Sequence, residues 1–273
     1  MFGKKCSIII GLTTFNTEML QISVPALARI KQKFHLVLHN DNPNVNVKKK
    51  HLRKLGYRGR VSIINTDTNV GQLGARLKIV EYVSERKLNP KWITFVDDDD
   101  VLTNVTIPNV KDNIFAIIQN AIIVRKRTSD LMRIMQNPSD YEIDSENVII
   151  DRPHIGASGT MIRWEIMHET CKVIRTIMDK INKINSGISW RAPVDAIMWS
   201  YLNSYVKYNK PEYIPIYMDS INYISIKMDS CDKKYGRAIL PTRNPEETYE
   251  KTLARYNALI NAALAAAPTG QNS

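Results

Sequence analysis

Four consecutive aspartates, residues 97–100, directly follow the apolar run WITFV at residues 92–96. Adjacent carboxylates repel one another, so bringing four of them together is costly unless a cation lies nearby. Mg²⁺ and Mn²⁺ prefer oxygen ligands, and such an ion commonly joins one or two carboxylates to substrate phosphates. Alternate residues of a turn after a strand point the same way, so Asp97 and Asp99 are predicted to hold a divalent metal. The alternative is a solvated acidic turn or a set of helix caps.

Further polar residues that could bind a ligand follow other apolar runs or open a helical segment. TTFN follows the run KCSIIIGL, HNDNP follows the run at residues 34–38, and NVGQLGAR begins at residue 69. Taken singly, each of these motifs is also a common turn or loop. The candidate residues in them are Thr13, Thr14, Asn16, Asp41, Asn42, Asn69, Gly71 and Arg76.

Strand and helix signals alternate through the first hundred residues. The predicted strands are residues 5–12, 34–38, 60–65 and 92–96, and the predicted helices are residues 18–33, 47–55 and 72–86. This alternation implies βαβ units and a parallel sheet, in which ligands bind beyond the carboxyl ends of the strands. We therefore expect Thr13, Asp41 and Asp97 to converge on one crevice.

The pattern after residue 102 is less regular, and it shows no internal repeat and no linker long enough to separate domains. Residues 113–125 continue the predicted sheet, and residues 141–152 form a loop or an edge strand. Further predictions are a strand at 160–164, helices at 165–185, 194–208 and 245–267, and a disordered tail, PTGQNS. The chain is thus expected to be a single α/β domain.

The order of these motifs resembles the GT-A-type glycosyltransferases of the family-2 kind. The matching succession, over about residues 5–102, is a strand with TTFN, a strand with HNDNP, NVGQLGAR opening a helix, and WITFVDDDD. The resemblance implies a GT-A, Rossmann-like α/β fold with a mostly parallel sheet flanked by helices, in a single domain with a C-terminal helical extension. It divides the chain into a nucleotide-sugar-binding half (1–110), an acceptor-binding half (111–240), and a C-terminal helix with a flexible tail (241–273).

The resemblance also assigns roles to the residues on the donor side. In the family, the loop after the first strand lines the pocket for the nucleotide base, and the Asp after the second strand contacts that base. The N-x-G-x-x-x-A-R element lies beside the diphosphate and the sugar, and the acidic motif holds the ribose and Mn²⁺ or Mg²⁺. The implied donor-binding residues are Thr13, Thr14, Asn16, Asp41, Asn42, Asn69, Gly71, Arg76, Asp97 and Asp98, and the implied metal ligands are Asp97 and Asp99.

The second half of the chain resembles the family more loosely. HIGASGTMIRW matches the stretch with the acceptor loop, so Gly156, Ser158 and Gly159 are implied to bind the acceptor; a tight turn into a strand is the alternative. APVDAIMW lies where inverting members often carry a Glu-Asp pair, of which only Asp195 is present here. Asp195 is the implied base, and a helix cap is its alternative role. Asp219 lies where some members carry a metal-binding His; its carboxylate could ligate a hard cation, but we expect a turn here.

The implied reaction is direct transfer of a sugar from a nucleotide-diphospho-sugar to an acceptor hydroxyl. The metal would neutralise charge on the leaving diphosphate, and Asp195 would take the proton from the acceptor. Arg76 or Arg163 would add positive charge near the diphosphate. UDP is the family's commonest donor nucleotide, and a saccharide or glycolipid is the leading acceptor. The alternatives are a hydroxylated DNA base, a nucleotidyltransferase reaction, and a non-catalytic nucleotide- or saccharide-binding protein.

The net charge of the chain indicates what kind of partner it could bind, and its cysteine content indicates its cellular compartment. The formal net charge of +11 favours anionic partners, so DNA or an anionic membrane surface could bind through basic patches. One patch comprises Lys48, Lys49, Lys50, Arg53, Lys54, Arg58 and Arg60, and a second spans residues 125–127; a solvated helix face is the alternative for the first. Three dispersed cysteines and no membrane-spanning run favour a cytoplasmic protein, with peripheral membrane contact as an extension of that expectation.

Overall fold

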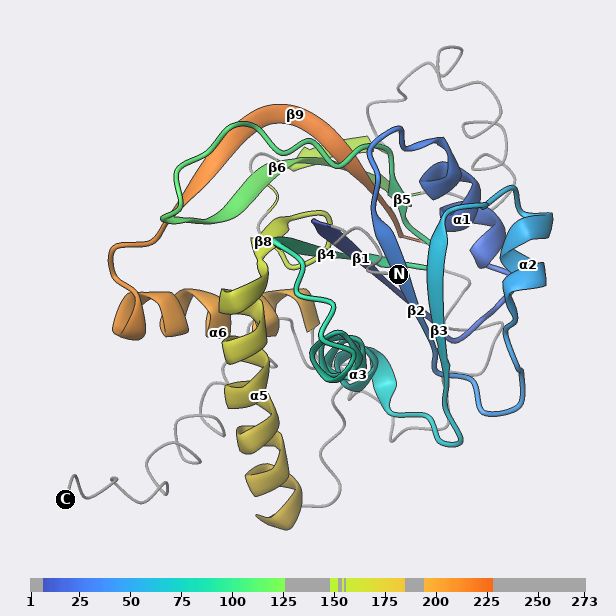
Figure 1. Ribbon diagram of the computed structural model, residues 1–273, viewed down its shortest axis with the longest axis horizontal. Coiled ribbons are helices and arrows are strands. Elements are labelled where there is room, and N and C mark those ends of the chain that lie inside the picture. Colours follow the sequence, from blue (N-terminus) through green and yellow to red (C-terminus); the bar gives the residue numbers. More distant parts are fainter. Residues whose placement is uncertain (1–6, 126–147, 152–153, 155, 185–193, 228–273) are drawn as a thin grey trace.

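The computed structural model describes residues 7–125, 148–151, 154, 156–184 and 194–227. These residues form an α/β domain around one nine-stranded sheet (Figure 1). The predicted C-terminal helix at 245–267 and the tail lie outside the described residues. So does most of the segment at 141–152, of which residues 148–151 form an edge strand. Among the described helices, none has the length and apolar character to cross a bilayer.

The N-terminal part of the sheet is parallel, as the alternating strand and helix signals predict. Its strands in spatial order are β3 (Arg60–Asn65), β2 (His35–Asn40), β1 (Ile8–Thr14) and β4 (Trp92–Asp97). In the register of these strands, Thr13 of β1 lies between His39 of β2 and Asp97 of β4. The polar residues at the strand ends therefore meet along one edge of the sheet.

Beyond β4 the sheet becomes mixed and curls. Its further strands are β8 (Met161–Arg163), β6 (Ile114–Arg125), β9 (Ile214–Lys227), β5 (Val101–Leu102) and β7 (Val148–Asp151). β6 and β9 pair in parallel, whereas β8 is antiparallel to both β4 and β6. Figure 1 shows β6 and β9 arching together above the rest of the sheet.

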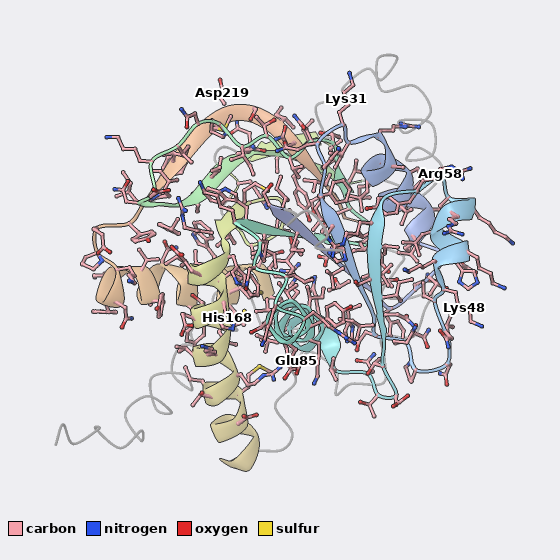
Figure 2. All side chains as sticks on the ribbon, in the orientation of Figure 1. Lys31, Lys48, Arg58, Glu85, His168 and Asp219 are labelled. Atoms are coloured by element: carbon pink, nitrogen blue, oxygen red, sulfur yellow. The ribbon has the colours of Figure 1, made fainter. Side chains whose placement is uncertain are left out.

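The predicted turn at Asp219 is wrong, because this residue lies inside β9. Its carboxylate accepts a hydrogen bond from Asn120 Nδ2 at 2.7 Å, across the pair with β6. The β6–β9 register shifts on both sides of Asn120, and this irregularity accommodates the polar residues that made the segment look like a turn. Asp219 is exposed and projects outward from β9 (Figure 2).

Helices cover both faces of the parallel strands. They are α1 (Leu20–Arg29), α2 (Lys49–Lys54), α3 (Gly71–Glu85), α5 (Trp164–Ile184) and α6 (Val194–Asn209). Alternate residues of β1 divide between two cores: Ile8 and Ile10 pack with α1 and α2, and Ile9 packs with α3, α5 and α6. Figure 1 shows α3, α5 and α6 together on one side of the sheet. This packing fixes where the first residues of α3 and α6 lie relative to the strand ends.

Candidate active site

The candidate site is organised around Arg76 of α3, whose side chain is completely buried. Its Nη2 lies 3.1 and 3.2 Å from the two carboxylate oxygens of Asp97, and its Nη1 lies 2.7 Å from Asp195 Oδ1. Nη2 also donates to Ser158 Oγ at 2.7 Å, and the guanidinium lies 5.5 Å from the centre of the Phe95 ring. One guanidinium therefore joins the end of β4 to the start of α6.

A buried guanidinium is tolerated here because two carboxylates surround it. Burial alone would lower the pKa of Arg76, but the charges of Asp195 and Asp97 raise it, so the side chain stays protonated. One guanidinium against two carboxylates leaves one net negative charge in the cluster. Removing Arg76 would leave two partly buried carboxylates close together without a counter-charge.

Asp97 ends β4 and is held on all sides by hydrogen-bond donors. Its Oδ1 accepts from Thr13 Oγ1 at 2.7 Å, and its Oδ2 accepts from Gln72 Nε2 at 2.6 Å. Arg76 supplies a second donor to each oxygen. A carboxylate has about four lone-pair sites, so those of Asp97 are fully used in this conformation. The predicted convergence of Thr13 and Asp97 is present as a direct hydrogen bond.

The other three aspartates of the run have different environments. Asp98 is buried and accepts from Thr14 Oγ1 at 2.6 Å, whereas Asp99 is half-buried. Asp100 is buried and accepts from the Tyr223 hydroxyl and from the backbone N–H of Ile226. Burial, together with the charges of the neighbouring aspartates, raises the pKa of Asp100 well above its usual range. Asp100 thus ties the acidic turn to β9, a role that the sequence did not predict.

No group of three or more His, Cys, Asp or Glu side chains that could hold a metal ion occurs in the described part of the chain. The predicted ligands Asp97 and Asp99 are two residues apart at the end of β4, but the Asp97 oxygens are taken up by protein donors. Asp97 could ligate a cation only if one of these donors moved away.

Asp41, predicted to meet the nucleotide base, is engaged at the start of α3. Its two carboxylate oxygens accept the backbone N–H groups of Val70 and Gly71, each at 2.8 Å. Asn69 Oδ1 accepts the same Gly71 N–H at 2.9 Å, and Gly71 has a φ of +74°, which favours glycine. Burial raises the pKa of Asp41 above its usual value, and the two backbone hydrogen bonds offset this rise only in part. Asp41 therefore positions the helix that carries Arg76.

Two asparagines connect the loops that follow β1 and β2. Asn42 Nδ2 donates to the carbonyl of Phe15 at 3.1 Å, and Asn16 Oδ1 accepts from the backbone of Glu18 at 3.1 Å. Asn16 Nδ2 is buried and has no hydrogen-bond partner among the described residues. A buried amide without a partner is costly, so Asn16 presents a donor suited to an oxygen of a bound ligand.

The predicted acceptor loop lies against Asp195. Asp195 Oδ1 accepts from the backbone N–H of Ser158 at 2.9 Å and from its hydroxyl at 2.8 Å. A Cβ added at Gly156 would lie 3.4 Å from the Cβ of Asp195. Gly159 has a φ of +73° and donates to the carbonyl of Phe95 at 3.0 Å, which anchors the loop on β4. The three loop residues and Asp195 are thus neighbours in the fold.

The Asp195 side chain is 36% exposed at the first turn of α6. Burial raises the pKa of its carboxyl, but the Arg76 guanidinium and the hydrogen bonds from Ser158 lower it by more. The net result is a pKa of about 2. In this state Asp195 is ionised and a weak base.

Arg163, the alternative source of charge near a diphosphate, lies elsewhere, so that suggestion was wrong. It is paired with Trp92 at the beginning of β4, at the opposite end of the strand from Asp97. Its guanidinium donates to the carbonyls of Ile114 and Lys111 and stacks over the Trp92 ring. The direction of β8, antiparallel to β4, carries Arg163 away from the site.

This chain is similar to one protein-family model and to several solved structures. A family model described as "Glycosyl transferase family 2" matches residues 8–156. Among solved structures, the chain resembles Staphylococcus aureus TarS (residues 1–349) at 14% identity and a TM-score of 0.49; the match covers 81% of this chain and 60% of TarS. It also resembles the mannosyltransferase PcManGT from Pyrobaculum calidifontis, solved with GDP-Man and Mn²⁺, at 10% identity and a TM-score of 0.41, over 98% and 77% of the two chains.

A third structure, apo GlyE of Streptococcus pneumoniae TIGR4, is 12% identical with a TM-score of 0.36, and the match covers 78% of this chain and 45% of GlyE. The chain thus spans less than two thirds of TarS and of GlyE, and no curated protein matches it. The family model, however, covers more than half of the chain and includes the four N-terminal parallel strands β1 to β4 together with Arg76 and the four aspartates. The chain belongs to glycosyl transferase family 2 and has the mixed α/β architecture of the GT-A fold.

Proposed function

We propose that the protein transfers a sugar from a nucleotide-diphospho-sugar to an acceptor hydroxyl. The observation that carries this proposal is the buried Arg76 bridge between Asp97 and Asp195, at the carboxyl ends of the parallel strands. Ligands of open α/β sheets bind at this edge. Family membership supports the reaction type.

The donor would lie along the loops that follow β1, β2 and β4. Thr13 and Thr14 end β1 and Asn16 lies in the loop after it, and the Asn16 amide nitrogen, which has no partner among the described residues, suits a carbonyl oxygen of a nucleobase. Arg76 and the start of α3 would face the diphosphate, because cations and helix N-termini both attract phosphate. Asp41, Asn42, Asn69 and Gly71 would support this region, and Asp98 is proposed as a further donor-binding residue. UDP is the nucleotide that we propose first.

We propose Mn²⁺ or Mg²⁺ as the cofactor, with Asp97 and Asp99 as its protein ligands. Their carboxylates have the right chemistry, since both ions prefer oxygen. The closed hydrogen-bond shell of Asp97 does not fit a metal without rearrangement, because Thr13, Gln72 and Arg76 use its lone pairs. The donor diphosphate is an anion that could draw Arg76 from Asp97, so metal and donor are expected to bind together.

Asp195 is the proposed base on the acceptor side, and Gly156, Ser158 and Gly159 are the proposed acceptor-binding loop. A general base contributes roughly 10²–10⁴-fold to a rate when its pKa approaches the working pH. Paired with Arg76, Asp195 has a pKa of about 2 and is a poor base. The proposed role therefore requires Arg76 to shift toward the donor when the substrates are bound. A saccharide or a glycolipid is the proposed acceptor, and the cytoplasm, with peripheral contact at a membrane, is the proposed location.

Nucleotide binding should be tested first, by the thermal unfolding of the protein with UDP, GDP, CMP or dTDP in Mn²⁺, Mg²⁺ or EDTA. A ligand at about 100 times its dissociation constant adds roughly 2.7 kcal/mol of stability, which gives a readable shift in Tm. Stabilisation by one nucleotide that disappears in EDTA is the expected result. No stabilisation by any nucleotide would leave a non-catalytic binding protein as the better description.

Asp195→Asn separates binding from transfer. This variant should retain the nucleotide-dependent Tm shift and lose transfer by roughly 10²-fold or more, because the proton acceptor is gone. Asp219→Asn is the matched control, since Asp219 is an exposed carboxylate on β9, away from the Arg76 cluster. Normal turnover by Asp195→Asn would refute the base assignment.

A further inference from the structure

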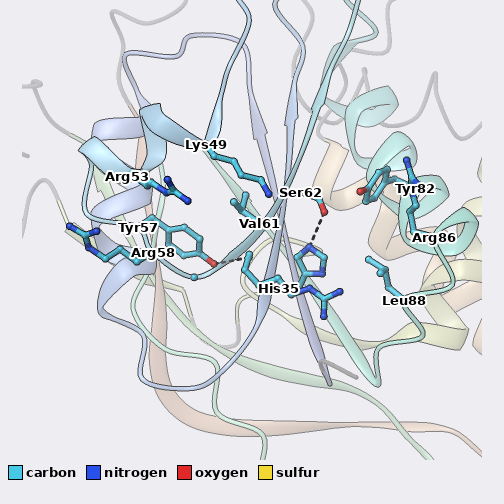
Figure 3. A pocket seen from close by; sticks show the side chains of 12 residues that line it. His35, Lys49, Arg53, Tyr57, Arg58, Val61, Ser62, Tyr82, Arg86 and Leu88 are labelled. Atoms are coloured by element: carbon cyan, nitrogen blue, oxygen red, sulfur yellow. Dashed lines mark hydrogen bonds between the residues drawn. The ribbon is translucent and has the colours of Figure 1, made fainter. Parts of the chain in front are cut away.

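A concave region lies at the opposite end of the parallel sheet from the candidate active site. It is a cleft of about 470 Å³ at the beginnings of β2 and β3, between α2 with its following loop and the end of α3 (Figure 3). β2 runs from His35, which lines the cleft, to Asn40, beside the donor loops. Five residue steps of an extended strand separate the two ends by about 17 Å. The cleft is therefore distinct from the candidate active site.

The side chains around this cleft are strongly basic. Five cations and no carboxylate line it, and the cations are Lys49, Arg53, Arg58, Arg60 and Arg86. None of the five forms an ion pair with a carboxylate in the part of the chain that the structure describes. Cations that converge without internal counter-ions repel one another, so a bound anion would stabilise them.

A buried histidine in the cleft is a second, independent sign of a ligand. The His35 side chain is only 3% exposed, and its Nε2 lies 2.9 Å from Ser62 Oγ. Its Nδ1 is buried and has no hydrogen-bond partner among the described residues. Burial lowers the pKa of His35 to about 4, and the charges of Arg60 and Lys49 contribute to the same shift. The ring is thus neutral and lies in a positive potential, with one nitrogen left for a ligand or a water.

The cleft is better suited to a small molecule than to a flat partner such as a membrane. Its volume lies within the range of ordinary small-molecule sites, about 300–1,000 Å³. Arg53 comes from α2 on one wall, and Tyr82 and Arg86 come from α3 and its end on the other (Figure 3). Tyr57 and Tyr82 add aromatic surface between the charges. A membrane would contact the outermost of these cations but would not reach a recessed histidine.

We propose that this cleft binds a soluble small molecule that carries phosphate groups, at a site separate from the donor crevice. Arg guanidinium groups bind phosphate through paired N–H donors, and Lys49 supplies a further point charge. The two walls would hold phosphates from opposite sides.

Inorganic pyrophosphate is a suitable test ligand, with binding measured by calorimetry in EDTA to remove metal-dependent donor-site binding. Arg53→Glu and Arg86→Glu reverse one charge on each wall, and both residues are exposed, so the fold should tolerate them. Lys31→Glu is the matched control, an exposed cation in the loop before β2 that does not line the cleft. Each wall variant should weaken pyrophosphate binding roughly tenfold or more, and the control by no more than about twofold.

Several results would overturn the proposal. One is absence of pyrophosphate binding by the unmodified protein. Another is an equal effect of all three variants, which would indicate diffuse surface charge. Weakening by Arg53→Glu alone would place the anion on the surface of α2 and not between the walls. Phosphatidylcholine vesicles with and without phosphatidic acid supply the last comparison, since binding confined to the acidic vesicles would mark a membrane-facing patch instead.

Discussion

Replacing Arg76 by methionine tests whether the buried bridge organises the candidate site. Methionine keeps most of the aliphatic volume beside Phe95 but removes the charge and all donors to Asp97, Asp195 and Ser158. Loss of one partner of a buried ion pair costs about 3–5 kcal/mol, because the remaining charge is left without compensation. Asp195 is 36% exposed and can regain some hydration, so a loss of about 3 kcal/mol in the free energy of unfolding is expected.

Urea denaturation at neutral pH measures this loss, and Arg175→Met supplies the comparison. Arg175 pairs with Glu81 on the surface between α5 and α3, where the two side chains are 39% and 29% exposed. Such a pair contributes about 1 kcal/mol or less. The double variant Arg76→Met with Asp195→Asn should recover about 1 kcal/mol or more relative to Arg76→Met alone, because one uncompensated carboxylate is removed.

The reasoning fails if Arg76→Met and Arg175→Met lose the same stability. It also fails if neutralising Asp195 in the Arg76→Met background destabilises the protein further. Either result would mean that the carboxylates are solvated well enough to need no counter-charge.

Three further stability predictions follow from particular contacts, each measured as a shift in urea midpoint. Asp41→Ala removes the acceptor of two backbone N–H groups at the start of α3 and should cost about 1–2 kcal/mol, whereas exposed Asp67→Ala should change stability by less than about 0.5 kcal/mol. Burial lowers the pKa of His35 and His39 to about 4 in the folded protein. Their contribution to the free energy of unfolding is therefore fully present above about pH 6.5, the pKa of histidine in the unfolded chain, and is lost as the pH falls toward 4. The loss should reach about 2 kcal/mol for each histidine at about pH 5, and His39→Gln should remove about half of this dependence. Gly159→Ala should cost at least about 2 kcal/mol, because φ is +73° and the new Cβ would meet a tyrosine ring of β9 at 2.6 Å; an unchanged midpoint would contradict this backbone argument.

The parallel half of the fold was predictable because its signals are local. Each strand is a short β-branched run that ends in polar residues, and each helix between strands shows its own apolar spacing. The carboxyl ends of parallel strands lie at the same edge of a sheet, so the convergence of Thr13 and Asp97 was predictable, although their hydrogen bond was not. β9 was missed because its polar stretch around Asp219 resembles a turn, and only its pairing with the irregular part of β6 makes it a strand.

The internal contacts of the candidate site were not predictable, because they join residues far apart in sequence. Asp41 looked like a ligand residue after a strand, and nothing in its neighbours shows that it accepts N–H groups from residues about 30 positions later. The burial of Arg76 depends on Asp195, 119 residues away. Local sequence patterns show that these residues are polar and lie near a strand end. Which of them form hydrogen bonds or ion pairs with one another depends on the packing of the folded structure.

Arg76 links two parts of the chain that lie far apart in sequence. It belongs to α3, beside the parallel strands, yet its charge and its hydrogen bond lower the pKa of Asp195 at the start of α6. Under the proposed function, a donor diphosphate competes with Asp195 for the same guanidinium, because phosphate is also an anion with paired acceptors. Once that competition draws Arg76 toward the donor, burial acts on Asp195 without an opposing charge, and the pKa of its carboxyl rises toward the range in which it can accept a proton. Such an exchange would keep Asp195 a weak base until a donor is bound, so that the acceptor hydroxyl is activated only when a sugar is present for transfer to it.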